Sequence, residues 1–150
     1  MIAAGAAHAE LGDALNGAWE GSLSGLSGAV IDDYSHHSAR FRITIAGDEV
    51  HVFTPAEQGA GYEEVKPGDF HIVRLGNSAL IHALDNSPAA PLGQGWVESW
   101  NLSVTLDGAD TLACVFTRQV NNHQMRPDES GAVFSAAFSG ELHRVGVDHV

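Results

Sequence analysis

The sequence predicts an all-β fold, an antiparallel meander of about eight strands that closes into a barrel. Apolar and polar residues alternate with a period of two in short segments along the chain, as in strands with one buried face. Glycine-rich turn signals separate these segments, and the chain has 17 glycines but only 5 prolines. With 150 residues, 44% of them hydrophobic, the chain suits one domain over residues 1–150 with a substantial core. Closure would also remove exposed strand edges.

The predicted elements follow one another with short connections. A helix over residues 6–15 is expected to end near Asn16-Gly17, so that residues 1–17 form a lead-in to the first strand. The expected strands are Ala18–Gly25, Ala39–Ala46, Glu49–Thr54, Phe70–Leu75, Ser78–Leu84, Trp96–Leu106, Thr111–Val120 and Ala132–Arg144. Two loops, Pro88–Gly95 and Asn121–Gly131, interrupt the meander without separating domains.

The dipeptide Gly47-Asp48 predicts a two-residue turn, which pairs Ile45 with Val50 in the first hairpin. One face of this hairpin is then uniformly apolar. The opposite face carries His51, which we expect to be solvated and which is therefore a weak functional candidate.

The dipeptide Gly76-Asn77 predicts a second tight turn, which places His71 opposite His82. Both faces of this hairpin contain apolar residues, so the inward side is ambiguous. We favour the face of His71 and His82, which would bring two imidazoles into the interior; in the other orientation Arg74 enters instead. The two histidines would be either a packed, hydrogen-bonded core pair or the source of a general base, since imidazole titrates near neutrality. A metal site would need a third ligand, for which Glu98 is the obvious supplier.

The most informative segment has Glu98 between Trp96 and Trp100 on an otherwise apolar strand face. The apolar set of the following strand ends in Arg118. A connection of two or four residues would put these two sets on different faces, whereas a three-residue loop puts them on the same face. We therefore expect the three-residue register, with Trp100 opposite Phe116 and Glu98 directly opposite Arg118. A charge on a buried face is costly unless it is paired or used, so this pair is the best place to look for function.

The Glu98–Arg118 pair is open to two interpretations. It is either a partly hydrated structural ion pair or a pocket in which Arg118 binds an anionic or enolate-like oxygen while Glu98 acts as acid or base. Apolar walls would raise the pKa of Glu98, whereas the guanidinium would lower it. The candidate catalytic residues are Glu98, His82 and Arg118. The candidate ligand-binding residues are Trp96, Trp100, His71, Phe116 and Phe138.

Composition excludes several classes of function. The net charge of −12, with Lys66 as the only lysine, argues against nucleic acid or an anionic membrane as a partner. The chain has no glycine-rich phosphate loop, no G-x-S-x-G and no CxxC or HExxH pattern, so neither a cofactor nor a metal is predicted. Cys114 lies on an apolar strand face, which favours inert packing. No apolar run approaches a membrane span and the N-terminus has no basic segment, so a cytoplasmic location is expected.

The segment Leu15–Gly21 resembles the G-x-W opening of lipocalin-like (calycin) barrels, through Gly17-Ala18-Trp19. In that family a short helical or coil lead enters the first strand, and its tryptophan closes the floor of the barrel. A basic residue near the end of the last strand often lies over that tryptophan, and Arg144 is the matching residue here. The resemblance implies a ligand cavity. Because this chain has one cysteine and no clear signal peptide, the comparison shifts towards intracellular members, which range from carriers to cofactor-free lyases, isomerases and decarboxylases.

The leading hypothesis is a small-molecule-binding β-barrel that acts as a cofactor-free acid/base enzyme, an isomerase, lyase or cyclase. Its substrate would be partly apolar and aromatic or carbonyl-bearing: the tryptophans would stack on it and Arg118 would orient its polar end. A second hypothesis is a non-catalytic carrier or sensor that uses the same cavity. A third is a barrel filled by its own side chains, with function in partner binding. The expected partner is a small molecule, and homodimerisation is left open.

Overall fold

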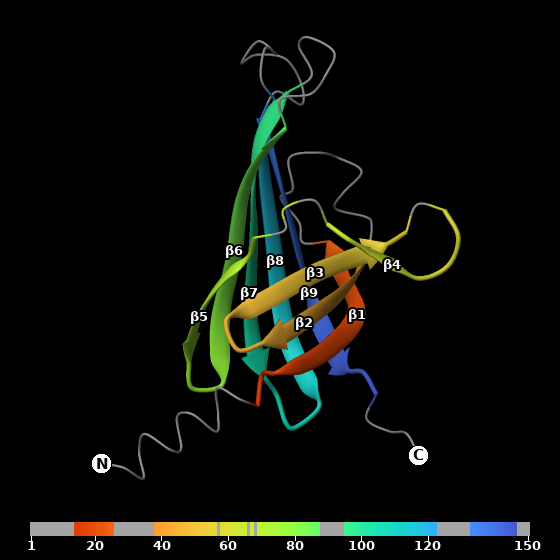
Figure 1. The fold of residues 1–150 in the computed structure, drawn as a ribbon, viewed down its shortest axis with the longest axis vertical. Coiled ribbons are helices and arrows are strands. Elements are labelled where there is room, and N and C mark those ends of the chain that lie inside the picture. Colours follow the sequence, from red (N-terminus) through yellow and green to blue (C-terminus); the bar gives the residue numbers. More distant parts are fainter. Residues whose placement is uncertain are drawn as a thin grey trace.

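Nine antiparallel strands form a single sheet in the order β4-β3-β2-β1-β9-β8-β7-β6-β5 (Figure 1). The computed structural model describes residues 14–25, 38–56, 58–65, 67, 69–87, 95–122 and 133–146. The strands are β1 (Gly17–Gly25), β2 (Ser38–Ala46), β3 (Glu49–Pro55), β4 (Tyr62–Glu64), β5 (His71–Leu75), β6 (Ser78–Ser87), β7 (Trp96–Leu106), β8 (Thr111–Asn122) and β9 (Val133–Arg144). No helix occurs within these described ranges, and most of the predicted helix over residues 6–15 lies outside them.

The predicted closure into a barrel is wrong, because β4 and β5 do not pair. The sheet curls strongly: buried side chains from β1–β3 and from β6–β9 share one core, against which the partly buried Ile72 of β5 packs, and β5 approaches β3 without joining it. The unpredicted strand β4 has three residues and bonds only to β3. Its exposed Glu63 and Glu64 place charge on this edge, which disfavours further strand pairing.

Two hairpin registers are confirmed. Ile45 pairs with Val50 across the turn at Gly47, and His71 pairs with His82 across the turn at Gly76. Both glycines adopt positive φ values, 64° and 62°, which two-residue hairpin turns require and other residues rarely adopt.

The register predicted for β7 and β8 is wrong by two residues. Leu106 pairs with Leu112 and Trp100 pairs with Arg118, so Glu98 is opposite Val120 rather than Arg118. The loop does contain three residues, but it is flanked by Asp107 and Thr111, whose backbones hydrogen-bond at 2.8 Å. Because a shift of two residues preserves the face on which each side chain lies, the apolar sets of both strands still coincide.

The inward orientation predicted for His71 and His82 is also wrong. Both side chains are exposed, while Ala79, Ile81 and Ala83 of the same hairpin are buried. We call the side of the sheet that packs on the core the inner face and the opposite side the outer face. Packing explains the outcome, because Ala83 is the cross-strand neighbour of Trp100 and a small side chain is needed beside the indole.

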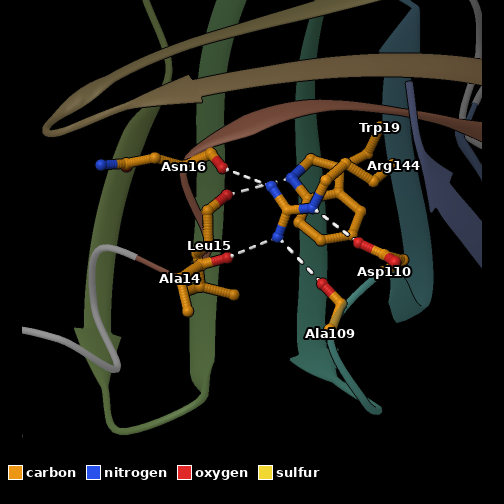
Figure 2. Close-up of polar contacts among 7 residues, drawn as sticks. All are labelled: Ala14, Leu15, Asn16, Trp19, Ala109, Asp110 and Arg144. Atoms are coloured by element: carbon orange, nitrogen blue, oxygen red, sulfur yellow. Dashed lines mark hydrogen bonds and ion pairs between the residues drawn. The ribbon is translucent and has the colours of Figure 1, made fainter. Parts of the chain in front are cut away.

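The floor of the curled sheet is closed by Arg144, which lies over Trp19 with its guanidinium carbon 4.2 Å from the ring centroid (Figure 2). Trp19 is fully buried and donates its indole N–H to the carbonyl of Leu15 at 3.0 Å. The arrangement expected for these two residues is therefore confirmed. The guanidinium donates to the carbonyls of Ala14, Asn16 and Ala109 and to the carboxylate of Asp110, at 2.8–3.2 Å. Arg144 thus joins the lead-in, β9 and the β7–β8 turn.

One position where β1 pairs with β9 has no room for a side chain. A Cβ added at Gly21 would lie 2.3 Å from the carbonyl oxygen of Glu141, which is backbone and cannot move aside easily. A glycine at this position lets the sheet curl tightly enough to enclose its core.

His51 connects β3 and β4 on the outer face rather than standing free in solvent. Its two ring nitrogens lie 2.8 Å from a carboxylate oxygen of Glu64 and 3.0 Å from one of Glu49. The hydrogen bond with Glu64, followed by that with Glu49, raises the pKa of His51 above its ordinary 6.5, against a smaller opposing effect of burial.

We expect NMR titration of His51 to give a pKa above 6.5, and Glu64→Gln to move it back towards that value. The folded state holds the proton of His51 more tightly than the unfolded state does. The contribution of protonated His51 to the stability of the fold is therefore fully present below pH 6.5 and is lost as the pH rises through the raised pKa. The chemical shifts of His143, which is exposed on the outer face of β9, provide a control, because Glu64→Gln should leave them unchanged at a fixed pH. An unshifted His51 would contradict the ion-pair assignment.

Candidate functional site

The candidate site lies on the inner face, at the end of the sheet where β7 begins and β8 ends. Trp96, Glu98 and Trp100 alternate along β7, and Arg118 comes from β8. Period-two alternation places all four on the face predicted from sequence, together with the apolar residues that follow them towards the floor. The predicted association of Glu98 with Arg118 therefore holds, although the two are diagonal rather than direct neighbours.

The Glu98 carboxylate accepts three hydrogen bonds. Oε2 accepts from Arg118 Nη2 at 2.6 Å and from the indole N–H of Trp96 at 2.8 Å. Oε1 accepts from the indole N–H of Trp100 at 2.6 Å. The carboxylate is the one buried charged group in the described part of the chain, and its side chain is only 5% exposed. Two indole donors on one carboxylate explain why a glutamate stands between two tryptophans.

These contacts determine the ionisation of Glu98. Burial by itself raises its pKa, but the hydrogen bonds from Arg118 and Trp100, the charge of Arg118 and the hydrogen bond from Trp96 together outweigh it. The pKa of Glu98 is consequently lower than its ordinary 4.5. The group is held as an anion at neutral pH.

Arg118 is the part of the cluster that reaches solvent. Its side chain is 29% exposed, and its guanidinium carbon is 5.1 Å from the centroid of Trp100. Only Nη2 is used in the ion pair. Nε is buried, and the structure shows no hydrogen-bond partner for it among the described residues. A buried N–H without a partner is unfavourable by about 1–3 kcal/mol, so this atom favours an additional acceptor at the site.

Two of the predicted ligand-binding residues belong to a packed aromatic cluster below the charged pair. Phe116 lies 5.2 Å from Trp100, 6.0 Å from Phe138 and 4.9 Å from Phe41, measured between ring centroids. All four residues are at most 9% exposed. Phe116 and Phe138 therefore form the buried, apolar base of the candidate site, whereas half-buried Trp96 and Arg118 lie at its accessible end.

The structure does not bring His71 and His82 to this site, because they lie on the outer face. It instead places Asp85 beside Glu98 as its cross-strand partner on β6. Asp85 is half-buried and continues the inward set of Ala79, Ile81 and Ala83. The alternation that places Asp85 on the same face as Ala79, Ile81 and Ala83 is present in the sequence. Asp85 was missed as a site residue because the opposite face of the hairpin was predicted to point inward.

A hollow of about 640 Å³ lies across β6, β7 and β8 at the same end of the sheet. Most of its lining residues point to the outer face: Leu84, Asn86, Val97, Ser99, Gln119 and Asn121. Asp85 and Glu98 also line it, but Trp100 and Arg118 do not, so it is mainly a feature of the outer face.

Other features contribute less to the site. Cys114 is buried on the inner face as expected, and burial raises its pKa to about 12, so it is not a reactive thiolate. Within the described ranges, no group of three or more histidine, cysteine or acidic residues could hold a metal ion. Nor do those ranges include a helix of the length and apolar character needed to cross a membrane. Comparison with protein-family models, curated proteins and solved structures finds no match for this chain.

Proposed function

We propose that this chain is a non-catalytic carrier or sensor that binds a small, partly apolar molecule through an anionic or carbonyl oxygen. The observation that carries the proposal is Arg118: Glu98 holds its guanidinium by Nη2, while the buried Nε has no partner among the described residues. A pre-oriented guanidinium binds an oxygen acceptor at a lower entropic cost than a free arginine side chain. Trp96 beside it supplies an aromatic surface for the apolar part of the ligand.

Binding is better supported than acid/base catalysis. A general acid or base works best with a pKa near the working pH, whereas Glu98 is held ionised by three donors. His82, the other proposed proton carrier, lies on the opposite face of the sheet. The carrier hypothesis needs neither group to exchange a proton.

We further propose a relationship to lipocalin-like proteins, as an open form of their up-and-down topology. The tryptophan of the Gly17-Ala18-Trp19 motif is covered by Arg144, and the first and last strands pair with each other. This relationship agrees with ligand binding, but it does not identify the ligand.

The binding proposal can be tested with two probes of similar shape, 1-naphthoate and uncharged 1-naphthalenemethanol. Saturable quenching of tryptophan fluorescence is expected for both, with the carboxylate bound about 10-fold more tightly because it accepts charge-assisted hydrogen bonds. Arg118→Lys keeps a positive charge for Glu98 but removes Nε, and it should weaken naphthoate binding about 10-fold while leaving the alcohol unchanged.

Arg42→Lys is a matched control, because Arg42 forms an ion pair with Glu20 on the outer face at 2.7 Å. It should bind both probes as the wild type does. Equal affinity of Arg118→Lys and the wild type for naphthoate, or no saturable binding of naphthoate at all, would overturn the proposal.

A further inference from the structure

The outer face of β5–β8 lacks charged residues in a strongly acidic protein. Position by position, these four strands present histidine, aliphatic, serine, threonine and amide side chains outward, and no aspartate, glutamate, lysine or arginine. The chain as a whole has 26 such charged residues, 19 acidic and 7 basic. The outer face of β1–β3 is different, since it carries the Glu20–Arg42 and His51–Glu49 pairs.

Aliphatic side chains project from this uncharged surface. Val73 and Leu75 on β5 and Leu80 and Leu84 on β6 are 63–78% exposed, and they form a ridge along one side of the sheet. The register places Val73 beside Leu80, and the paired imidazoles of His71 and His82 lie between these two residues and Leu84. Exposed apolar patches of several hundred Å² generally mark an interaction surface.

Two hollows lie next to the ridge. One, of about 640 Å³, is bordered by Leu84, Val97 and Gln119; the other, of about 250 Å³, is bordered by Leu80, Asn101 and Val115. The same surface therefore carries both a projecting ridge and the depressions that could receive one. Self-complementarity of this kind is what a two-fold interface between identical chains requires, because each copy offers the same patch.

We propose that the outer face of β5–β8 is the homodimer interface of this protein, with the ridge of each copy seated in the hollows of the other. Charge favours this face: two copies with a net charge of −12 each repel one another, and contact through strands whose outward side chains include no carboxylate keeps most acidic groups apart. The inference does not depend on the proposed ligand-binding function.

The size of the surface indicates a weak or moderate dimer. With strands about 4.8 Å apart and a rise of about 3.4 Å per residue, the face covers on the order of 500–600 Å². Each partner in a specific complex buries about 600–1,000 Å², so this surface is at or just below the lower end of that range. We expect dissociation in the micromolar range.

Sedimentation velocity over a concentration series tests the proposal. The wild-type chain is expected to dimerise, and Leu80→Glu is expected to weaken association about 100-fold or more, because it buries an unpaired carboxylate at the centre of the interface. Leu80 is 63% exposed, so this variant should retain the far-UV circular dichroism spectrum and melting temperature of the wild-type monomer. Val145→Glu, an exposed valine outside β5–β8, should dimerise normally.

A cross-linking experiment locates the contact directly. The buried Cys114, with its raised pKa of about 12, should not react with maleimides, so a single added cysteine reports on its own position. A short bis-maleimide should join two chains through Asn101→Cys in the interface but not through Ser22→Cys on the outer face of β1. A wild-type monomer at millimolar concentration, an unaffected Leu80→Glu dimer or preferential cross-linking at Ser22→Cys would each overturn the proposal.

Discussion

Replacing Arg144 by methionine is expected to destabilise the fold by about 3–4 kcal/mol. The side chain of Arg144 is 20% exposed, and its guanidinium donates to three backbone carbonyls and one carboxylate and lies on the face of Trp19. Methionine fills much of the same volume over the indole but offers no donor, so the carbonyls of Ala14, Asn16 and Ala109 lose their partner. Hydrogen bonds to charged groups contribute about 1.5–3 kcal/mol each, with overlap between them. The melting temperature should fall by about 10 °C for a domain of this size.

Arg40→Met is the matched control for this experiment. Arg40 is exposed and contacts only Tyr62, by a hydrogen bond of 3.2 Å and a ring contact of 5.6 Å, among the interactions the structure gives it. Its loss should change the free energy of unfolding by less than about 0.5 kcal/mol. If the two substitutions changed the free energy of unfolding by comparable amounts, the contacts of Arg144 with Trp19 and the backbone carbonyls would not stabilise the fold as proposed.

The placement of Arg144 over Trp19 is what the resemblance of Gly17-Ala18-Trp19 to the lipocalin-like opening implies, and neither alternation nor turn signals in this chain show it. The hairpins at Gly47 and Gly76 were predictable, since a two-residue turn leaves one register. The β7–β8 connection is longer and permits several registers, which is why the pairing was displaced by two residues while the buried face was correct.

The inward face of the β5–β6 hairpin could not be predicted from hydrophobicity. One face has Ala79, Ile81 and Ala83, and the other has Leu80 and Leu84, so the more apolar set is the exposed one. Small side chains face inward because the neighbouring strand already supplies Trp100. Whether the sheet closes into a barrel depends on whether β4 and β5 lie close enough to pair. The alternation of residues within a strand does not predict the distance between two strands.

The Glu98–Arg118 association could be predicted because an isolated carboxylate on an apolar face needs a partner. The roles of Trp96 and Trp100 as hydrogen-bond donors to that carboxylate could not, because alternation shows the face of a side chain but not the direction of its indole N–H. The position of the second carboxylate, Asp85, beside Glu98 follows from the orientation of β6. Because that orientation was predicted wrongly, Asp85 was not recognised as a neighbour of Glu98.

Replacing Glu98 by glutamine is expected to destabilise the protein by about 2–3 kcal/mol at pH 7. The amide retains one oxygen acceptor, but its NH₂ group faces donors where the carboxylate accepted from Trp96, Trp100 and Arg118. Breaking a buried pair typically costs about 3–5 kcal/mol, and the partial exposure of Arg118 reduces this. Glu20→Gln, which breaks an ion pair with both side chains about one-third exposed, should cost less than about 1 kcal/mol.

The pH dependence distinguishes loss of the charge from loss of packing. Because the folded state lowers the pKa of Glu98, its contribution is fully present above pH 4.5 and is lost as the pH falls through the lowered value. The stability difference between the wild type and Glu98→Gln should therefore be constant near neutrality and shrink below pH 4.5. Denaturant unfolding at several pH values, followed by tryptophan fluorescence, measures this difference. A gap that stays constant into acid would show that Glu98 acts through packing, and the ionic anchor on which ligand binding by Arg118 depends would then be absent.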